Sequence, residues 1–352
     1  MNIFISGWPR GEGKGGISQY KYDAETGGLE LLSVTDSDIA FGTVFVNADK
    51  NVLYAVNEIR DPEGGNIYSY KIRENGTGLE FMGKVSTQAP NPSYMGIDKS
   101  GRFAVCSNHS MDGFDAPVLL YSVNEDGSIG EMLDKICLEG SSIGKNQDMP
   151  HPHCTIFSPD GSFFVVCDKG SDDVRIFAID KEDGKLVECT RWKETPGYMP
   201  RYAVFHPVKP FFYHNNESNA IVNAYSYDTD KHFAPIGEYS AIPEDWDNGV
   251  HQQGICIDPE GDYLYTALMG RTGIAVFKVD QTDGSLSLIQ NVEENLNWIR
   301  DMRITPDGRF LIATFLESGK VVVYRREQDG RLVNSGNIYD CTRAAGIAIT
   351  EI

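Results

Sequence analysis

One structural phrase recurs along this chain and constrains its fold more than any other feature. The phrase is an apolar strand, a D/P-x-G turn, a second strand, a third strand, a turn near Asp-Gly and a fourth strand. Its first half reads HCTIFSPDGSFFVVCDKG from His153, RYAVFHPVKPFFYHNNES from Arg201, QGICIDPEGDYLYTALMG from Gln253 and RDMRITPDGRFLIATFLE from Arg300. Looser copies begin near Tyr94 and Thr43. Repetition at a period of about 45–55 residues indicates one supersecondary unit that is stacked many times.

Each repeat has the marks of a four-stranded antiparallel sheet. Asp-Gly pairs favour tight hairpins because both residues tolerate positive φ. They occur at 126–127, 183–184, 283–284 and 329–330. The runs between the turns alternate apolar and polar residues with a period of two, which is typical of strands. The units between about residue 43 and residue 340 therefore predict six blades of a β-propeller.

The two ends of the chain supply a seventh blade. Residues 2–35 contain three strands, whereas AAGIAIT at 344–350 is a single strand. If this last strand becomes the innermost strand of blade 1, no strand edge is left open for aggregation. We therefore expect an all-β fold, a seven-bladed β-propeller with four-stranded antiparallel blades, in one domain over residues 1–352.

The charge balance limits the classes of partner. The chain has 51 acidic and 31 basic residues, so its formal net charge is −20. Nucleic acids and anionic membranes both require a basic face, and we expect neither as a partner. The N-terminal MNIFISGW leads directly into an alternating strand, without a basic region followed by an apolar one. We expect a soluble, cytoplasmic protein whose partner is a small molecule; the sequence leaves its oligomeric state open.

The seven cysteines give no sign of a disulfide framework or a metal site. Their number is odd, and no C-x-x-C pair occurs. Several lie inside apolar strand runs, as Cys167 does in FFVVC. We interpret them as buried small hydrophobic residues that stay reduced.

The repeat also predicts which residues share one mouth of the central channel. The second strand of each blade runs antiparallel to the first, so the residues that open the first strand and those that end the second meet at one edge. Loops on rigid scaffolds often carry function. The polar residues at these positions are more varied than the Gly, Asn and Asp of ordinary turns, and they include Asn108, His109, His151, His153, Asp168, Arg201, Glu217, His251, Gln253, Arg271, Arg300 and Glu317.

These strings resemble a known family. PHPHCTIFSPDGSFFVVCDKG, MPRYAVFHPVKPFFYHNNES and IRDMRITPDGRFLIATF resemble the lactonase family of seven-bladed propellers. That family includes the propeller-type 6-phosphogluconolactonases and the fungal 3-carboxy-cis,cis-muconate lactonizing enzyme. The similarity covers nearly the whole chain. Its P-H-x-H and P-R-x-x-x-x-H-P strings are moderately specific, whereas the P-D-G turns are shared with unrelated propellers.

The resemblance implies three catalytic residues. The muconate enzyme has a histidine opening blade 4, an arginine opening blade 5 and a glutamate at the end of the second strand of blade 5. His153, Arg201 and Glu217 match these places. A further family arginine in blade 6 has no match, because TALMGR puts Met269 there. Arg271 and Arg300 are the candidate replacements.

The three residues provide what the opening of a lactone requires. A neutral His153 can remove a proton from water, because imidazole titrates near neutrality. Arg201 can bind a carboxylate or a phosphate, or stabilise the oxyanion. Glu217 can orient the histidine or donate a proton. The surrounding polar residues predicted to bind the substrate are His151, Asn108, Gln253, Arg271 and Arg300.

Alternatives remain open at this point. The leading hypothesis is hydrolysis of a small anionic sugar-acid lactone such as 6-phosphogluconolactone. A carboxymuconate-type lactonizing cyclase would use the same three groups in the reverse sense. A non-catalytic propeller could instead bind a small molecule or a protein at this mouth. We expect no cofactor and no metal, because the pair His151 and His153 has no third ligand at a firm spacing.

Overall fold

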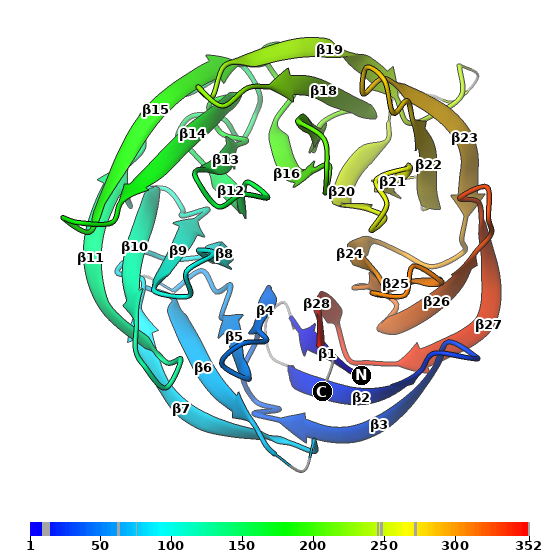
Figure 1. The fold of residues 1–352 in the computed structure, drawn as a ribbon, viewed down its shortest axis with the longest axis horizontal. Helices are drawn as coiled ribbons and strands as arrows, with labels where there is room; N and C mark the ends of the chain where they lie inside the picture. The colour runs from blue at the N-terminus through cyan, green and yellow to red at the C-terminus, as the bar shows by residue number, and fades with distance from the viewer. Residues whose placement is uncertain are drawn as a thin grey trace. The chain divides into compact units, whose positions relative to one another are not determined.

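The fold is known from a computed structural model, which describes residues 1–8, 15–61, 64–74, 76–244, 246, 249–270 and 273–350. The regular structure in these ranges is entirely β-strand, with 28 strands in seven four-stranded antiparallel sheets (Figure 1). The predicted seven-bladed β-propeller with four-stranded blades is therefore confirmed. No helix in the described ranges has the length and hydropathy of a membrane span.

The chain divides into two compact units. The first is Met1–Tyr22, Glu30–Gly197 and Ala345–Ile352, and the second is Asp23–Leu29 and Tyr198–Ala344. The expectation of one domain over residues 1–352 stays a prediction.

Blades 1–4 make up the first unit, apart from Asp23 at the end of β2 and the leading residues of β3 and β28. Blade 1 has the order β28 (Ala344–Thr350), β1 (Asn2–Gly7), β2 (Gly16–Asp23) and β3 (Gly28–Thr35). Blade 2 consists of β4 (Val44–Asn47), β5 (Val52–Val56), β6 (Asn66–Ile72) and β7 (Leu79–Ser86). Blade 3 consists of β8 (Pro92–Ile97), β9 (Phe103–Asn108), β10 (Pro117–Val123) and β11 (Ile129–Cys137). Blade 4 consists of β12 (Pro152–Phe157), β13 (Phe164–Asp168), β14 (Asp173–Asp180) and β15 (Lys185–Lys193).

Blades 5–7 make up the second unit. Blade 5 consists of β16 (Pro200–Phe205), β17 (Phe211–Asn216), β18 (Ile221–Tyr227) and β19 (Phe233–Ser240). Blade 6 consists of β20 (His251–Ile257), β21 (Tyr263–Met269), β22 (Gly273–Val279) and β23 (Leu286–Glu293). Blade 7 consists of β24 (Ile299–Ile304), β25 (Phe310–Phe315), β26 (Lys320–Arg326) and β27 (Leu332–Asp340).

The C-terminal strand completes blade 1, as the sequence predicts. Figure 1 shows β28 beside β1, and the two are neighbours in one sheet. The buried hydroxyl of Ser6 accepts the backbone N–H of Gly346 at 2.7 Å and donates to the backbone oxygen of Gly42 at 2.7 Å. One side chain thus joins the first and last strands of the chain to the segment that leads into blade 2.

Burial follows the strand order within each blade. Every residue of β9 and of β25 is buried, whereas the outermost β11 and β27 are mostly exposed or half-buried. The second strand of these blades is therefore covered on both faces. The same rule corrects one prediction about the cysteines: five are buried, but Cys137 and Cys189 lie on outermost strands and are exposed.

The Asp-Gly turns help to fasten neighbouring blades. Tyr213, on the second strand of blade 5, donates its hydroxyl to the backbone oxygen of Gly284 in blade 6 at 3.0 Å. Tyr265 makes the same bond to Gly330 in the next blade at 2.8 Å. Both glycines have a φ of 78°, a left-handed conformation that disfavours other residues. The turns predicted from the sequence therefore also serve as docking points between blades.

Candidate active site

A β-bulge opens the first strand of five blades and sets the geometry of the candidate site. In blade 4, Pro152 pairs with Asp168 and Cys154 pairs with Cys167, so His153 is an extra residue on the first strand. The register between first and second strands shifts in the same way in blades 3, 5, 6 and 7. The bulge residues, as we call them, are Ser93, His153, Arg201, Gln253 and Arg300. Bulges re-aim side chains and are common beside active sites.

Two further positions repeat around each bulge. The lead residue stands two positions before the bulge residue, and in blades 3–7 it is Asn91, His151, Met199, His251 and Trp298. The return residue follows the second strand and donates its backbone N–H to the oxygen of the lead residue. These bonds join His109 to Asn91 at 3.0 Å, Lys169 to His151 at 3.3 Å, Glu217 to Met199 at 2.8 Å and Leu316 to Trp298 at 2.9 Å. They confirm that both strand ends lie at one edge of the blade in blades 3, 4, 5 and 7.

The polar and charged bulge residues are almost completely buried. The exposed fraction is 2% for His153, 5% for Arg201, 1% for Gln253 and 3% for Arg300. Moving a polar or charged group out of water costs free energy, so its presence at four bulges needs a structural or chemical reason. Ser93 supplies a structural one, since its hydroxyl donates towards backbone oxygens of Ser107 and Pro152 at 3.1 and 3.0 Å.

Three histidines gather in the first unit. The rings of His109 and His151 stack with centroids 4.3 Å apart, and the ring of His153 meets that of His109 edge-on at 5.8 Å. Nδ1 of His151 lies 2.7 Å from the backbone oxygen of His109. Burial of the His151 ring lowers its pKa. His109, His151 and His153, all among the polar residues that the sequence analysis singles out, thus lie in one cluster.

Asp168 holds the loop that carries His151. Its Oδ1 accepts the backbone N–H of His151 at 2.6 Å and that of Gly170 at 3.0 Å, while Oδ2 accepts the hydroxyl of Ser171 at 2.6 Å. The carboxyl group is fully buried, and burial raises its pKa. These contacts make Asp168 a support for the histidine cluster.

Asn108 also has a structural part in the first unit. Its side-chain nitrogen lies within hydrogen-bond distance of Thr87 Oγ1, Ala89 O and Pro90 O, at 3.0, 2.8 and 3.2 Å. The residue is fully buried. Its amide therefore fixes the segment between β7 and β8, a function that the sequence pattern did not indicate.

Arg201 and Glu217 are brought together in the second unit. The guanidinium nitrogen Nη1 of Arg201 forms an ion pair with Oε2 of Glu217. The backbone oxygen of Glu217 lies 2.9 Å from Nδ1 of His251, the lead residue of blade 6. Glu217 thus contacts two groups. Its side-chain carboxylate pairs with the guanidinium of Arg201, and its backbone oxygen lies beside the imidazole of His251.

The remaining predicted residues of the second unit differ in their surroundings. Gln253 is buried, and its Oε1 has no hydrogen-bond partner among the described residues. Arg300 occupies the bulge of blade 7. Arg271 lies outside the described residues. Met269 pairs with His251 across β20 and β21.

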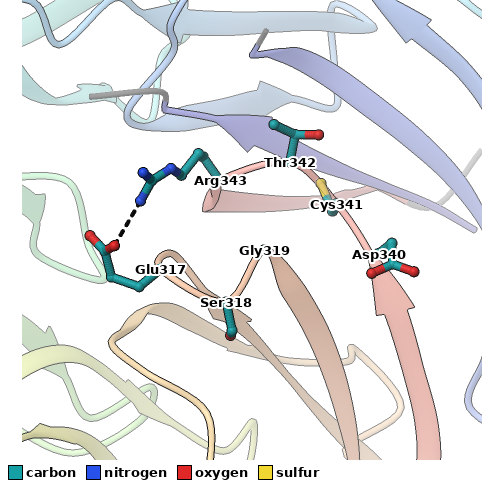
Figure 2. Close-up of a pocket in the computed structure, with 7 residues that line it drawn as sticks. All are labelled: Glu317, Ser318, Gly319, Asp340, Cys341, Thr342 and Arg343. Carbon is teal, nitrogen blue, oxygen red and sulfur yellow. Dashed lines mark hydrogen bonds and ion pairs between the residues drawn. The ribbon is translucent and has the colours of Figure 1, made fainter. Parts of the chain in front are cut away.

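Two further features of the second unit lie outside this arrangement. A cavity of about 350 Å³ is lined by Glu317, Ser318, Gly319, Asp340, Cys341, Thr342 and Arg343, and Figure 2 shows Arg343 reaching towards Glu317, to which it is bonded at 2.8 Å.

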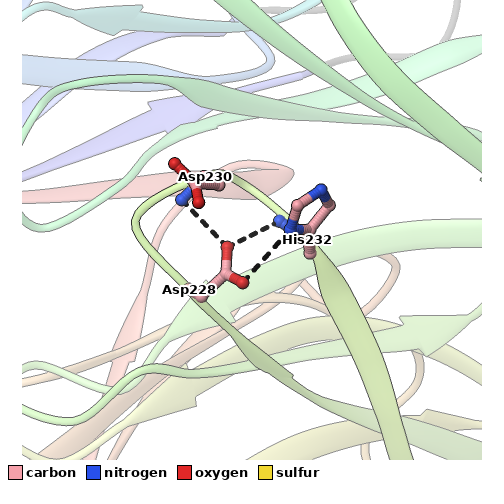
Figure 3. Close-up of side chains that lie close together, drawn as sticks. All are labelled: Asp228, Asp230 and His232. Carbon is pink, nitrogen blue, oxygen red and sulfur yellow. Dashed lines mark hydrogen bonds and ion pairs between the residues drawn. The ribbon is translucent and has the colours of Figure 1, made fainter.

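Asp228, Asp230 and His232 form the candidate metal group of the described residues, on the exposed turn between β18 and β19 (Figure 3). There Asp228 already accepts the backbone N–H groups of Asp230 and His232, both at 2.9 Å.

Comparison with known proteins identifies the family. Residues 2–345 match the family described as lactonase, 7-bladed beta-propeller. The chain is 30% identical over 325 residues to a 6-phosphogluconolactonase of Bacillus subtilis, covering 91% of this chain and 90% of the relative. It is 29% identical to a 6-phosphogluconolactonase of Formosa agariphila, with 90% of each chain covered. This protein belongs to the lactonase family of seven-bladed β-propellers.

A solved structure shows the same fold. The periplasmic gluconolactonase PpgL of Pseudomonas aeruginosa superposes with a TM-score of 0.91 at 21% identity, covering 98% of each chain. At that identity the similarity concerns the fold.

Proposed function

We propose that this protein hydrolyses a small lactone of a sugar acid, with 6-phosphogluconolactone as the first candidate. In this proposal His153 is the general base that removes a proton from the attacking water. Arg201 binds an anionic group of the substrate or the oxyanion, and Glu217 holds its guanidinium in place. The names of the relatives from Bacillus subtilis and Formosa agariphila support this class of reaction.

The observation that carries the proposal is the repeated bulge. The bulge position is occupied by a histidine in blade 4, by an arginine in blades 5 and 7, and by a glutamine in blade 6. In blade 3 the same bulge is built with a serine, so the backbone does not require these larger groups. Their burial costs free energy, which a function in binding and catalysis explains.

Gln253 favours a hydroxylated substrate. Its Oε1 is a buried acceptor without a partner in the described part of the chain, and a substrate hydroxyl would supply the missing donor. A sugar-acid lactone carries such hydroxyls, whereas a carboxymuconate has none. We propose that His151 and Arg300 also bind the substrate, while Asn108 supports the fold. Arg271 remains a proposed replacement for the family arginine.

A panel of lactones tests the proposal. The protein is incubated with 6-phosphogluconolactone, gluconolactone and a muconolactone, and acid release is followed in a pH-stat. We expect catalysed opening of a sugar lactone. Loss of diene absorbance with carboxymuconate, and no sugar-lactone opening, would assign the cyclase instead. Background rates with every compound would indicate a non-catalytic binder, the alternative that Met269 at the family arginine position favours.

A further inference from the structure

His251 is an exposed histidine whose orientation and tautomer are both fixed by the backbone. Its Nδ1 lies 2.9 Å from the backbone oxygen of Glu217. A carbonyl oxygen only accepts hydrogen bonds, so Nδ1 carries the hydrogen. Nε2 has no hydrogen-bond partner among the described residues, and the side chain is exposed. The imidazole therefore presents Nε2 to solvent.

The same construction occurs a second time in the chain. His151 is also a lead residue, and its Nδ1 meets the oxygen of the return residue His109 in the preceding blade at 2.7 Å. The ring of His151 is buried and stacks on that of His109. The lead residue is therefore a histidine in both blade 4 and blade 6. The histidine of blade 4 is buried, whereas that of blade 6 is exposed to solvent.

Glu217 connects His251 to Arg201, the residue proposed to bind the substrate. The backbone oxygen of Glu217 accepts the hydrogen bond from His251, and the side chain of Glu217 pairs with Arg201. That pairing engages the carboxylate of Glu217 with the guanidinium of Arg201, so we do not assign the proton transfer to Glu217. Ring opening of a lactone still needs a proton for the departing alkoxide. The group next to Glu217 that can carry one is His251.

We propose that His251 is the catalytic acid that protonates the leaving alkoxide, an inference that rests on the proposed lactonase function. A general base takes a proton from water as the water oxygen bonds to the carbonyl carbon. The bond between that carbon and the ring oxygen then breaks, and the electron pair stays on the ring oxygen. His251, protonated at Nε2, transfers this proton to the ring oxygen. The products are a carboxylic acid and an alcohol, and no oxidant or further reactant takes part.

The variant His251→Asn tests this function with little structural change. The Asn amide keeps a donor near the position of Nδ1, and it has no group that can transfer a proton. We expect kcat for the sugar lactone to fall at least about 100-fold, with KM within about threefold of the wild type. His232→Asn, on the exposed turn between β18 and β19, is the matched control and should keep full activity. A kcat for His251→Asn within about threefold of wild type would overturn the inference.

Chemical rescue distinguishes a proton donor from a structural residue and from a base. In His251→Ala, added imidazole should restore part of the lost kcat, because the site of His251 is open to solvent. At constant total imidazole, the rate that imidazole adds, divided by the rate of His251→Ala without imidazole, should decrease as pH rises through neutrality, because imidazolium is the donor. An increasing ratio would make His251 a base, and no rescue would make it structural; either result overturns the inference. If the wild-type protein itself opens no lactone, the proposed function fails instead.

Discussion

The carboxylate of Glu217 pairs with the guanidinium of Arg201 within blade 5. Only 6% of the Arg201 side chain is exposed, against 23% of the Glu217 side chain. The guanidinium thus keeps its charge in a buried place, beside a carboxylate that reaches towards solvent. A buried charge that loses its partner is costly, so this pair links the stability of blade 5 to the proposed site.

Removing the charge of Glu217 should therefore destabilise the protein. For Glu217→Gln we expect the free energy of unfolding to fall by about 2 kcal/mol, less than for a fully buried pair because Glu217 is partly exposed. Urea denaturation followed by fluorescence measures this change. The double variant Arg201→Met/Glu217→Leu should regain most of the stability but none of the activity. Unchanged unfolding of Glu217→Gln would show that the pair does not hold the buried guanidinium.

Replacing Gln253 with an apolar residue should increase stability and decrease activity. Its buried Oε1 lacks a partner among the described residues, so Gln253→Met removes an unsatisfied polar group while nearly keeping the volume. We expect a gain of about 1 kcal/mol in the free energy of unfolding and a decrease of about 10-fold or more in kcat/KM for a hydroxylated lactone. Loss of stability in Gln253→Met would mean that the amide serves the fold rather than the substrate.

Burial of His151 should make stability depend on pH. Its pKa is lowered, so below the ordinary value of 6.5 the unfolded chain binds a proton that the native state does not. Stability should therefore fall as pH decreases from 6.5 towards the lowered pKa, by at most about 1.4 kcal/mol per pH unit.

The variant His151→Gln isolates this contribution. It should flatten the dependence below pH 6.5, measured as urea midpoints between pH 5 and pH 7.5. Other groups, such as Asp168 with its raised pKa, titrate in both proteins and cancel in the comparison. His232→Gln, on an exposed turn, is the control. An equal slope in His151→Gln and wild type would contradict the account of the histidine cluster.

The turn at Gly284 should tolerate no side chain. Its φ is 78°, and an added Cβ would lie 2.7 Å from the ring of Phe211. Gly101 has a φ of 69° and open space around it, so Gly101→Ala measures the cost of the backbone conformation alone. We expect Gly284→Ala to lose at least about 1 kcal/mol more than Gly101→Ala in urea denaturation. Equal losses would show that docking between blades does not depend on this close approach.

Period and turn chemistry were sufficient to predict the fold from the sequence. Alternating strands and the Asp-Gly pairs determined the number of blades, and the lone strand at 344–350 indicated how blade 1 is completed. The cysteines show where this reasoning fails. Cys137 and Cys189 lie in runs that look like the others, but they belong to outermost strands whose faces meet solvent.

The sequence indicates residues for a candidate site but not the contacts that they make. A single extra residue such as His153 hardly disturbs an alternating pattern, so the bulges could not be predicted. The positive φ of Met199 and Trp298 was equally hidden, because neither residue type favours it. The sequence placed His109 and His251 at the mouth but gave them no function. The bond between His251 and Glu217 uses a backbone oxygen, which leaves no signal in residue type.

The rate at which His153→Ala hydrolyses 6-phosphogluconolactone tests the central claim most directly. The account predicts a kcat/KM at least about 100-fold below wild type, in a protein that still unfolds cooperatively in urea, and a similar loss for Arg201→Ala. His232→Ala and Arg331→Ala, on exposed turns, should keep the wild-type rate. If His153→Ala and Arg201→Ala both remain within about threefold of wild type, these residues do not perform the chemistry.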